Sequence, residues 1–508
     1  MRGVPLPVLR IREGMNFPHD EAAGPVIFFG RPLDSAIVVE FMIRENPLTK
    51  EVDEMERNLT TGSVLKNIFV FSLPYLLSYF LQTLYGMADL FIIGQFEGVA
   101  STTAVSIGSQ VMHMLTVMIV GLAMGSTVSI GQAVGGKDRE KAASAIGNTV
   151  TLFLSLSLLL TVVLLLLVRP ITGLMSTPSE AVEGTAAYLT ICFLGIPFVT
   201  AYNIISSIFR GMGDSKSPMY FIAVACAANI GLDYLFMGVF GMGPSGAALG
   251  TTLSQAVSVA VSLWVILKRK SGISVGRRDF RPLRPVMGQI LKIGIPIALQ
   301  DGFIQVSFII ITIIANRRGL NDAAAVGIVE KIISFLFLVP SSMLSTVSAL
   351  GAQNMGADRP DRAKLTLRYA VIIAVCFGTF AALLMQFMAE PVVALFTDVS
   401  SPDGAAAVRL GGQYLRGYVW DCVFAGIHFS FSGYFCACGR SGISFLHNLT
   451  AIVLVRVPGV YLASVTFPDT LLPMGLATSA GSLLSVMVCA AAFAFLCRRE
   501  NKVAIGGE

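Results

Sequence analysis

Long apolar stretches recur along the chain from residue 66 onward, each of about 20 residues or more. This length matches a bilayer hydrocarbon core roughly 30 Å thick. Only a helix satisfies its own backbone polar groups at that depth, so each stretch is predicted to be helical. The pattern therefore predicts an all-α polytopic membrane protein with twelve transmembrane helices. The predicted spans are 68–94, 105–134, 146–168, 186–208, 218–240, 247–267, 290–315, 324–350, 369–388, 410–436, 442–465 and 471–497.

Basic residues favour one side of the membrane. Twenty-five of the 36 Lys and Arg residues fall in loops and flanks that are inside when the amino terminus is inside, and five fall in the outer ones. Because cytoplasmic loops carry the excess of basic residues, both termini are predicted to be cytoplasmic. We expect a multi-pass protein of the inner (plasma) membrane.

The longest inner loop, 268–289, is also the most basic and divides the spans six and six. Before this linker we expect a flexible cytoplasmic tail at 1–57 and a first lobe of six helices at 58–267. After it we expect a second six-helix lobe at 290–497 and a short cytoplasmic tail at 498–508.

The two halves resemble each other in sequence. Because six is an even number, both repeats begin on the same side of the membrane and are parallel, related by an axis along the membrane normal. Such a duplication places a substrate site between two lobes, which favours a transporter over a channel or a membrane-embedded enzyme. The corresponding segments are Phe71–Pro74 with Ile293–Pro296, Gly131–Arg139 with Ala352–Arg359, and Tyr188–Leu189 with Tyr414–Leu415.

Composition and motifs narrow the function further. The chain is 54% hydrophobic and 13% charged, against about 25% charged in soluble domains, which excludes a soluble multidomain enzyme. Its net charge of +5 is spread out, so no nucleic-acid partner is expected. No nucleotide-binding or hydrolase motif occurs in a supporting context, so we expect no catalytic residues, no metal site and uphill transport driven by an ion gradient.

Ionisable residues inside the spans are costly and usually functional. In the first half, Asp89 and Asp233 are predicted to lie roughly 8–10 Å below the outer surface, at about 1.5 Å per helical residue. Asn229 shares a helix face with Asp233, and Thr251 and Tyr188 lie near the same depth. Burial disfavours a charged carboxylate, so such a group is suited to exchanging a proton or holding a monovalent cation. The alternative is that Asp89 is wet at the interface and Asp233 is merely hydrogen-bonded.

In the second half, Asp301 and Asp421 lie near mid-membrane without an obvious basic partner. They are candidates for a second cation site. Glu330 adjoins Lys331, which predicts an ion pair between them. Arg456 is predicted to be the structural partner of an acidic residue.

Three histidines and two prolines complete the candidates. His113, His428 and His447 are scattered over three spans, which indicates packing or helix–helix hydrogen bonds rather than a site. Pro74 and Pro296 occupy matched positions in the two halves and should kink their helices. Bending at these prolines is a candidate motion, and a static kink is equally compatible.

Taken together, these residues resemble the multidrug and toxic compound extrusion (MATE) family across 66–497. The resemblance implies two six-helix lobes that form a V-shaped cavity. It also implies export of amphipathic or cationic drugs by antiport with Na⁺ or H⁺, without an organic cofactor and with a monomer expected. The segments that carry it are Pro74 followed by Met87–Gly94, Phe209–Asp214, Asn229–Asp233, Gly246–Thr251 and Gln353–Ala357.

The resemblance also implies site residues. In archaeal and bacterial members the coupling cation binds in the outer half of the first lobe and bends the first helix, here near Pro74. Some relatives instead carry a glutamate ligand in the first helix of the second lobe. That stretch offers Asp301 and Gln305 here, with Asp421 about one turn from an expected aspartate, so the lobe that couples stays open. The first-lobe site falls on Asp89, Asn229, Asp233, Thr251 and Tyr188.

Three other functions remain as alternatives. A flippase for lipid-linked oligosaccharides or another lipid-linked substrate would need more basic residues for phosphate than the Arg456 and Lys331 found within the spans. A major-facilitator transporter also has twelve helices in parallel halves, but the repeated loop after the eighth span fits the MATE family better. A membrane enzyme would require convergent His, Asp or Glu residues.

Overall fold

The computed structural model of the protein describes residues 57–268, 273–397 and 399–505. Within these ranges every regular element is helical, and no strand occurs. The predicted tail up to residue 56 and residues 269–272 of the predicted linker lie outside the described residues.

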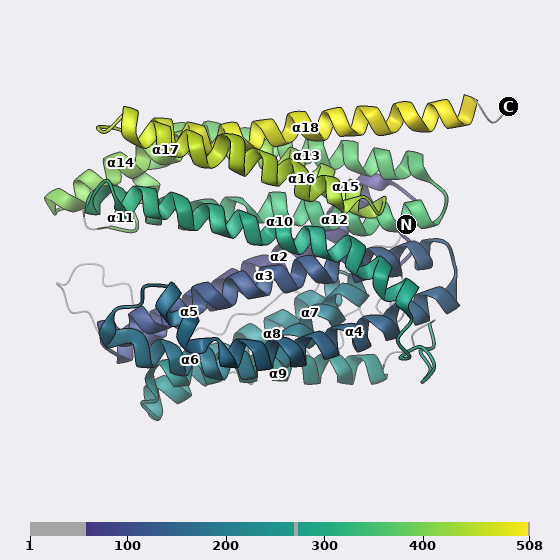
Figure 1. The fold of residues 1–508 in the computed structure, drawn as a ribbon, viewed down its shortest axis with the longest axis horizontal. Coiled ribbons are helices and arrows are strands. Elements are labelled where there is room, and N and C mark those ends of the chain that lie inside the picture. The colour runs from purple at the N-terminus through teal and green to yellow at the C-terminus, as the bar shows by residue number, and fades with distance from the viewer. Residues whose placement is uncertain (1–56, 269–272, 398, 506–508) are drawn as a thin grey trace, which may run out of the picture. The chain divides into compact units, whose positions relative to one another are not determined.

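The first half of the sequence forms one group of helices (Figure 1). Its helix starts follow local capping chemistry, since the Ser63 and Asp138 side chains accept hydrogen bonds from the backbone of the first turns of α2 and α4. The elements are α2 (Val64–Phe96), α3 (Val99–Gly135), α4 (Arg139–Leu166), α5 (Val168–Leu174), η2 (Ser179–Ala181), α6 (Val182–Leu194), α7 (Ile196–Gly211), α8 (Lys216–Asp233), η3 (Tyr234–Val239) and α9 (Gly243–Lys268).

The second half repeats this arrangement. Its last helix continues to Ile505, so most of the predicted tail at 498–508 is helical. The elements are α10 (Arg284–Asn316), α11 (Leu320–Leu336), α12 (Leu338–Gly356), α13 (Pro360–Ala394), α14 (Pro402–Tyr418), α15 (Asp421–Ala437), α16 (Ser441–Ala451), η4 (Ile452–Arg456), α17 (Val457–Thr466) and α18 (Leu472–Ile505).

The described residues include ten helices long and apolar enough to cross a membrane, or eleven when α6 and α7, bent by 48°, count as one. The predicted tenth span, 410–436, is divided between α14 and α15, and neither piece reaches the length of a span alone. The break falls at Val419 and Trp420, just before the buried Asp421. An all-α membrane fold is therefore confirmed, and the number twelve stays a prediction.

Prolines mark several changes of helix geometry. Pro197 follows the bend between α6 and α7, and Pro458 follows the π-helical turn η4. Pro74 and Pro296 lie inside uninterrupted helices, α2 and α10. The matched prolines are thus accommodated without breaking either helix.

The two halves meet through α3, which packs against α10 and α12 between the two groups (Figure 1). Gly135 lies against the backbone of Gln353, and Gly356 lies against the backbone of Gln132. A Cβ atom at either glycine would overlap the facing carbonyl group, so only glycine permits this approach. Because Gln132 and Gly135 correspond to Gln353 and Gly356 in the repeat, the two contacts are equivalent.

Hydrogen bonds repeat the same symmetry. Gln132 Nε2 donates to the Ala437 carbonyl oxygen at 2.8 Å, and Gln353 Nε2 donates to the Gly211 carbonyl oxygen at 3.1 Å. Each glutamine therefore reaches from its own half to the end of a helix in the other half. This exchange supports the predicted parallel repeats related by a two-fold axis.

Residues 57–62, here called the N-terminal strap, join both halves at the same end of the bundle. The Arg57 backbone N–H donates to the Met212 carbonyl of the first half at 2.9 Å. The Leu59 N–H donates to Gln353 Oε1 of the second half at 3.0 Å. Arg359 and Arg362 of the second half donate to strap carbonyl groups at 3.1 to 3.2 Å. The strap thus holds the halves together where α3 and α12 end.

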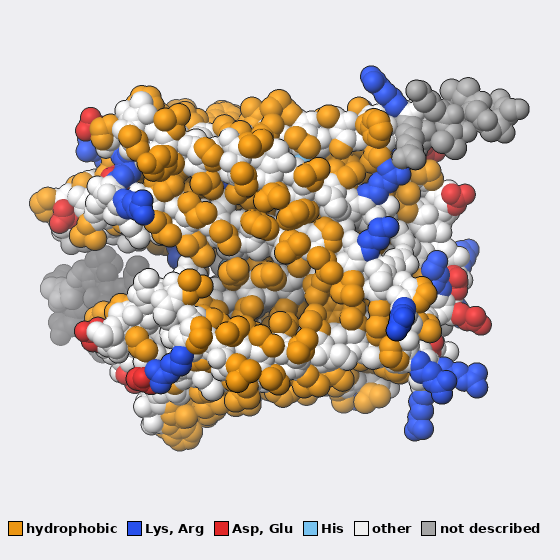
Figure 2. Space-filling model, in the orientation of Figure 1, with side chains coloured by type: hydrophobic (Ala, Val, Ile, Leu, Met, Phe, Trp, Pro, Cys, Tyr) orange, Lys and Arg blue, Asp and Glu red, His pale blue; other side chains and the backbone are white. Residues whose placement is uncertain are grey.

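We call this end the basic end, because Lys and Arg side chains gather there on the face shown in Figure 2. Hydrophobic side chains cover the middle of the same face, as expected for a surface in contact with lipid. Between the two halves this face is hollowed.

Candidate functional site

Asp89 of α2 lies in the interior of the first half, with only 2% of its surface exposed. Thr251 of α9 approaches it, and the Thr251 hydroxyl donates to Asp89 Oδ2 at 3.0 Å. The same hydroxyl lies 3.0 Å from the Ala247 carbonyl oxygen, which fixes the side chain over its own helix. The interpretation of Asp89 as a wet interfacial residue is therefore wrong.

Asp233 and Asn229 of α8 complete the cluster. Both are fully buried, and their spacing of four residues places them on one helix face. Both side chains interact with the Asp89 carboxyl group. Asp233 Oδ1 also packs directly against Gly250 of α9, where there is no side chain to displace it. Three helices, α2, α8 and α9, thus bring two carboxyl groups, an amide and a hydroxyl together.

The cluster is rich in acceptors that the chain itself does not satisfy. Within the described residues, Asp89 Oδ1, both Asp233 oxygens and both polar atoms of the Asn229 amide have no hydrogen-bond partner of good geometry. No Lys or Arg forms an ion pair with Asp89 or Asp233 in that part of the chain. Two buried carboxylates are tolerated only when their charge is balanced. The oxygen set is suited to a shared proton or to a small hard cation.

The local backbone is unusual beside this cluster. Directly after Asp233, α8 passes into the π-helical turn η3. Such turns are rare and frequent at functional sites, because the inserted residue re-aims neighbouring side chains. Apolar periodicity gave no sign of this turn.

Tyr188 lies close to the cluster without joining its hydrogen bonds. Its ring packs against Gly108, and its hydroxyl lies 3.1 Å from Ser109 Oγ, both in α3. The side chain is 2% exposed and belongs to an apolar cluster. Ser109 was not singled out from the sequence, since a lone serine in an apolar span carries no signal.

In the second half, Asp421 has the basic partner that the sequence did not reveal. Arg456 Nη2 lies 3.3 Å from Asp421 Oδ2 and donates to the Tyr418 hydroxyl at 3.0 Å. The expectation that Asp421 lacks a partner is wrong, and the expectation that Arg456 serves an acidic residue is confirmed. The residues are 35 apart and on different helices, so only the fold pairs them.

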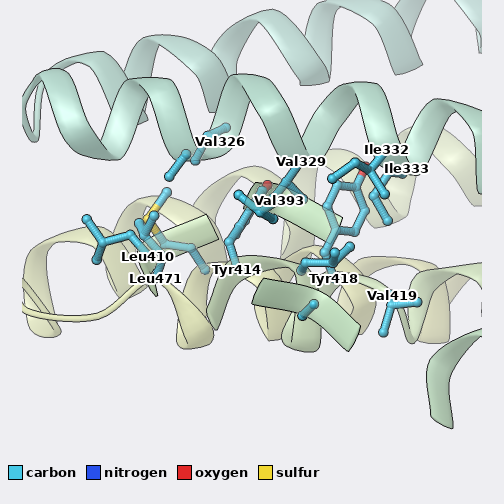
Figure 3. Packing of buried hydrophobic residues seen from close by; sticks show 14 of the residues in the cluster. Val326, Val329, Ile332, Ile333, Val393, Leu410, Tyr414, Tyr418, Val419 and Leu471 are labelled. Carbon is cyan, nitrogen blue, oxygen red and sulfur yellow. The ribbon is translucent and has the colours of Figure 1, made fainter. Parts of the chain in front are cut away.

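The ion pair borders a large apolar core. Figure 3 shows Tyr414 and Tyr418 of α14 facing Val329 and Ile332 of α11. Both tyrosines are fully buried there. The Arg456 guanidinium is therefore enclosed by aromatic and aliphatic groups.

Glu330 does not pair with Lys331. Both Glu330 oxygens accept from the Thr312 hydroxyl of α10, at 3.2 and 3.3 Å, while Lys331 is exposed. Successive residues of a helix point about 100° apart, so adjacent charges do not face each other. The predicted Glu330–Lys331 ion pair is wrong.

Asp301 lies at the contact between the halves. Its Oδ1 accepts weakly from Gln300 Nε2 at 3.5 Å, and its carboxyl group abuts Gly121 of α3. Gln305, one turn further along α10, is half-buried. Within the described residues no hydrogen bond or ion pair connects Asp301 with Asp421, so these candidates occupy separate places.

His428 and His447 are not isolated from each other. Their ring centroids lie 5.5 Å apart, and both side chains are buried. His447 also lies within hydrogen-bond distance of the Ser432 and Ser485 hydroxyl groups, at 2.9 and 3.2 Å. The prediction of helix–helix hydrogen bonding fits His447. The three histidines do lie on three helices, but the expectation that His428 and His447 are isolated is wrong.

Two sequence-related groups of membrane-spanning helices with carboxyl groups in their interior define a polytopic membrane transporter. The family model MatE matches residues 74–235 and 296–462, one stretch in each half. The chain belongs to the MATE family of efflux transporters.

Curated relatives agree with this assignment. The chain is 30% identical over 408 residues to the probable multidrug resistance protein YpnP of Bacillus subtilis, covering 80% of this chain and 90% of that one. It is 29% identical over 341 residues to the probable multidrug resistance protein YoeA of the same organism, covering 66% and 74%. The multidrug export protein MepA of Staphylococcus saprophyticus is 23% identical, over 80% of this chain and 89% of that one.

Solved structures share the fold. A crystal structure of MATE in complex with MaL6 matches with a TM-score of 0.80 and 23% identity, covering 89% of this chain and 99% of that one. A MOP superfamily transporter from Pyrococcus furiosus matches with a TM-score of 0.78 and 23% identity, covering 87% and 97%. The two-lobed membrane architecture is thereby confirmed.

Proposed function

We propose that this protein exports organic cations by antiport with Na⁺ or H⁺, and that Asp89, Asn229, Asp233 and Thr251 bind the coupling cation. One observation carries the proposal: two buried carboxyl groups adjoin each other with unsatisfied oxygens and, among the residues that the structure describes, without a basic partner. Their charge calls for a mobile cation. Multidrug transporters among the relatives support drugs as the exported substrates.

Coupling follows from charge balance. An entering cation or proton neutralises the cluster and draws α2, α8 and α9 together, while its loss leaves repelling carboxylates. Asp89 lies on the same helix as Pro74, where the missing backbone hydrogen bond lowers the cost of bending. Bending of α2 at Pro74, and of α10 at the matched Pro296, would transmit this movement of the helices to the substrate site expected between the two lobes. No catalytic step or organic cofactor enters this scheme.

The flippase alternative receives less support. Recognition of a lipid-linked phosphate calls for basic groups that are free to bind it. Arg456, one of the two basic residues within the predicted spans, is paired with Asp421 and is not free to bind a phosphate, so Lys331 of α11 is the remaining basic group of that pair.

The sidedness is part of the proposal. Both termini are placed in the cytoplasm and the protein in the inner membrane, because basic residues concentrate at the end where the described chain starts (Figure 2). In this orientation the cluster lies in the outer half of the membrane.

The test is exchange in proteoliposomes. A cationic dye should move against Na⁺ or H⁺, and Asp89→Asn or Asp233→Asn should abolish this exchange, because each removes a carboxylate that balances the cation. Imposing Na⁺ and pH gradients separately identifies the ion. Glu183→Gln is the control, since Glu183 is an exposed carboxylate paired with Arg169, which is also exposed.

Normal exchange by both aspartate variants would overturn the assignment of the coupling site. Their folding is checked by size-exclusion profile and melting temperature. A wild-type protein that moves dye without either gradient would overturn antiport itself.

A further inference from the structure

Arg456 is held in the interior of the second half by four kinds of contact. Its guanidinium pairs with Asp421 and donates to Tyr418, and its Cζ lies 5.1 Å from the Phe308 ring centroid. Its Cβ packs against Gly481 of α18. The Arg456 side chain is 8% exposed and the Asp421 side chain is fully buried. The guanidinium therefore has a built environment on α10, α14, α15 and α18.

The repeat places Arg456 within one helical turn of the positions that correspond to Asn229 and Asp233 of the first-half cluster. A spacing of 226 residues relates Tyr188 to Tyr414. The same spacing carries Asn229 to position 455, next to Arg456. Each of the two helices contains a π-helical turn, η3 after α8 and η4 after α16, but the turns are out of register, because the spacing of 226 carries η3 to 460–465 and η4 spans Ile452–Arg456. Near these corresponding positions, the first half has carboxyl and amide groups, and the second half has a fixed positive charge.

We propose that the Arg456 guanidinium balances the charge of Asp421 in the second half, as the coupling ion balances the charges of Asp89 and Asp233 in the first half. Because this positive charge is fixed to the chain, we call it the tethered cation. Asp421 is then neutralised within the chain in every state of the cycle. The second half binds no coupling ion, and the first half alone sets the number of ions moved per cycle. This inference rests on the proposed function of the first-half cluster.

The physical basis is the cost of uncompensated buried charge. A carboxylate without water needs a positive partner held close with good geometry. Arginine suits this place because its guanidinium stays charged at any physiological pH and stacks on aromatic rings. Glu330 and Tyr414 also face this region, and Glu330 is satisfied in part by the Thr312 hydroxyl.

Binding stoichiometry tests the proposal in the purified full-length protein. Radioactive sodium and proton uptake are measured separately at saturation. The wild type should bind one coupling ion per chain, and Asp421→Asn and Glu330→Gln should leave that number unchanged. Asp89→Asn should abolish binding. A fall in stoichiometry in Asp421→Asn or Glu330→Gln would overturn the proposal.

Replacing Arg456 with an uncharged residue should increase the number of bound ions. Arg456→Met leaves Asp421 without its partner and should create a second binding site for Na⁺ or for a proton. The double variant Arg456→Met with Asp421→Asn should return to one ion per chain. Failure of a folded Arg456→Met variant to gain a site would also overturn the proposal.

A charge-conserving variant covers the case in which Arg456→Met does not fold. Should Arg456→Met fail to fold, Arg456→Lys, which keeps the charge, should fold and keep one ion per chain. A second ion bound by Arg456→Lys would count against the proposal. If the wild type binds no Na⁺ and no proton, the proposed function of the first half is wrong. A change in the number of bound ions that depends on Asp421 concerns the second half alone.

Discussion

Thr251 shows how a single side chain tunes the first-half cluster. Its hydroxyl is the group with a well-formed hydrogen bond to Asp89, while Asn229 and Asp233 approach with polar atoms that lack good partners. A hydroxyl bonded to a buried carboxylate contributes about 1.5–3 kcal/mol. It also orients the carboxylate toward its neighbours. Thr251 should therefore affect ion affinity more than folding.

Thr251→Val should weaken binding of the coupling ion about tenfold, because the valine keeps the shape and loses the hydroxyl. Thr251→Ser should retain most of the affinity. The measurement is the ion concentration at half-maximal dye exchange. Thr252→Val is the matched control, since the neighbouring Thr252 side chain lies against Gly195 at the break between α6 and α7. Equal loss in both valine variants would contradict a specific role for Thr251.

At the residue scale, the sequence predicts where a side chain lies along its helix axis but not which way it points around that axis. Depth along a helix follows from counting residues, so Asp89 and Asp233 could be placed at a similar depth before the fold was known. Rotation about the helix axis and the partner helix do not follow from counting. For that reason the Arg456–Asp421 pair and the Thr312–Glu330 hydrogen bond emerged only from the structure.

At the scale of elements, the close packing of α8 on α9 shapes the cluster. Gly250 provides the space that Asp233 occupies, and a Cβ atom there would overlap Asp233 Oδ1. Hydropathy predicted the existence of both helices, yet it could not predict this contact. It also missed η3, η4 and the break that divides 410–436, because the residues at these places are themselves largely apolar and leave the average hydropathy unchanged.

Gly250→Ala should displace Asp233 and abolish ion-coupled exchange. Overpacking of this kind costs about 1–3 kcal/mol, so the melting temperature should fall by a few degrees without unfolding. Gly231→Ala is the control, because a Cβ atom at Gly231 of α8 meets nothing within 4 Å. Exchange assays and thermal melts of both variants check the prediction. Wild-type coupling in Gly250→Ala would show that the position of Asp233 is not critical.

At the scale of the whole described unit, two pairs of residues related by the repeat make close contacts between the halves. Gln132 with Gly356 and Gln353 with Gly135 surround the two-fold axis at the basic end. The sequence repeat predicted that these two helix ends correspond. It did not predict that they touch, because a repeat in sequence specifies a symmetry operation and not the distance from its axis.

Gln353→Leu should favour opening at the basic end, because it removes the hydrogen bonds to Gly211 and Leu59. At about 0.5–1.5 kcal/mol for each bond, the ratio of open to closed molecules should rise about tenfold. Spin labels at positions 140 and 361, with accessible native cysteines replaced, measure the separation of the halves. Gln386→Leu is the control, since the Gln386 side chain donates to the Ala382 and Arg416 carbonyl groups within the second half. An unchanged distance distribution would contradict a latch role for Gln353.

The N-terminal strap has a consequence for biosynthesis. Its partners Gln353 and Arg359 lie 294 and 299 residues later in the chain than the strap residues they bind. A ribosome therefore completes the first half, and several helices of the second, before the second-half part of the docking surface exists. Until then the strap can bind only to its first-half partner, Met212, so its full docking must follow insertion of the first half and the start of the second.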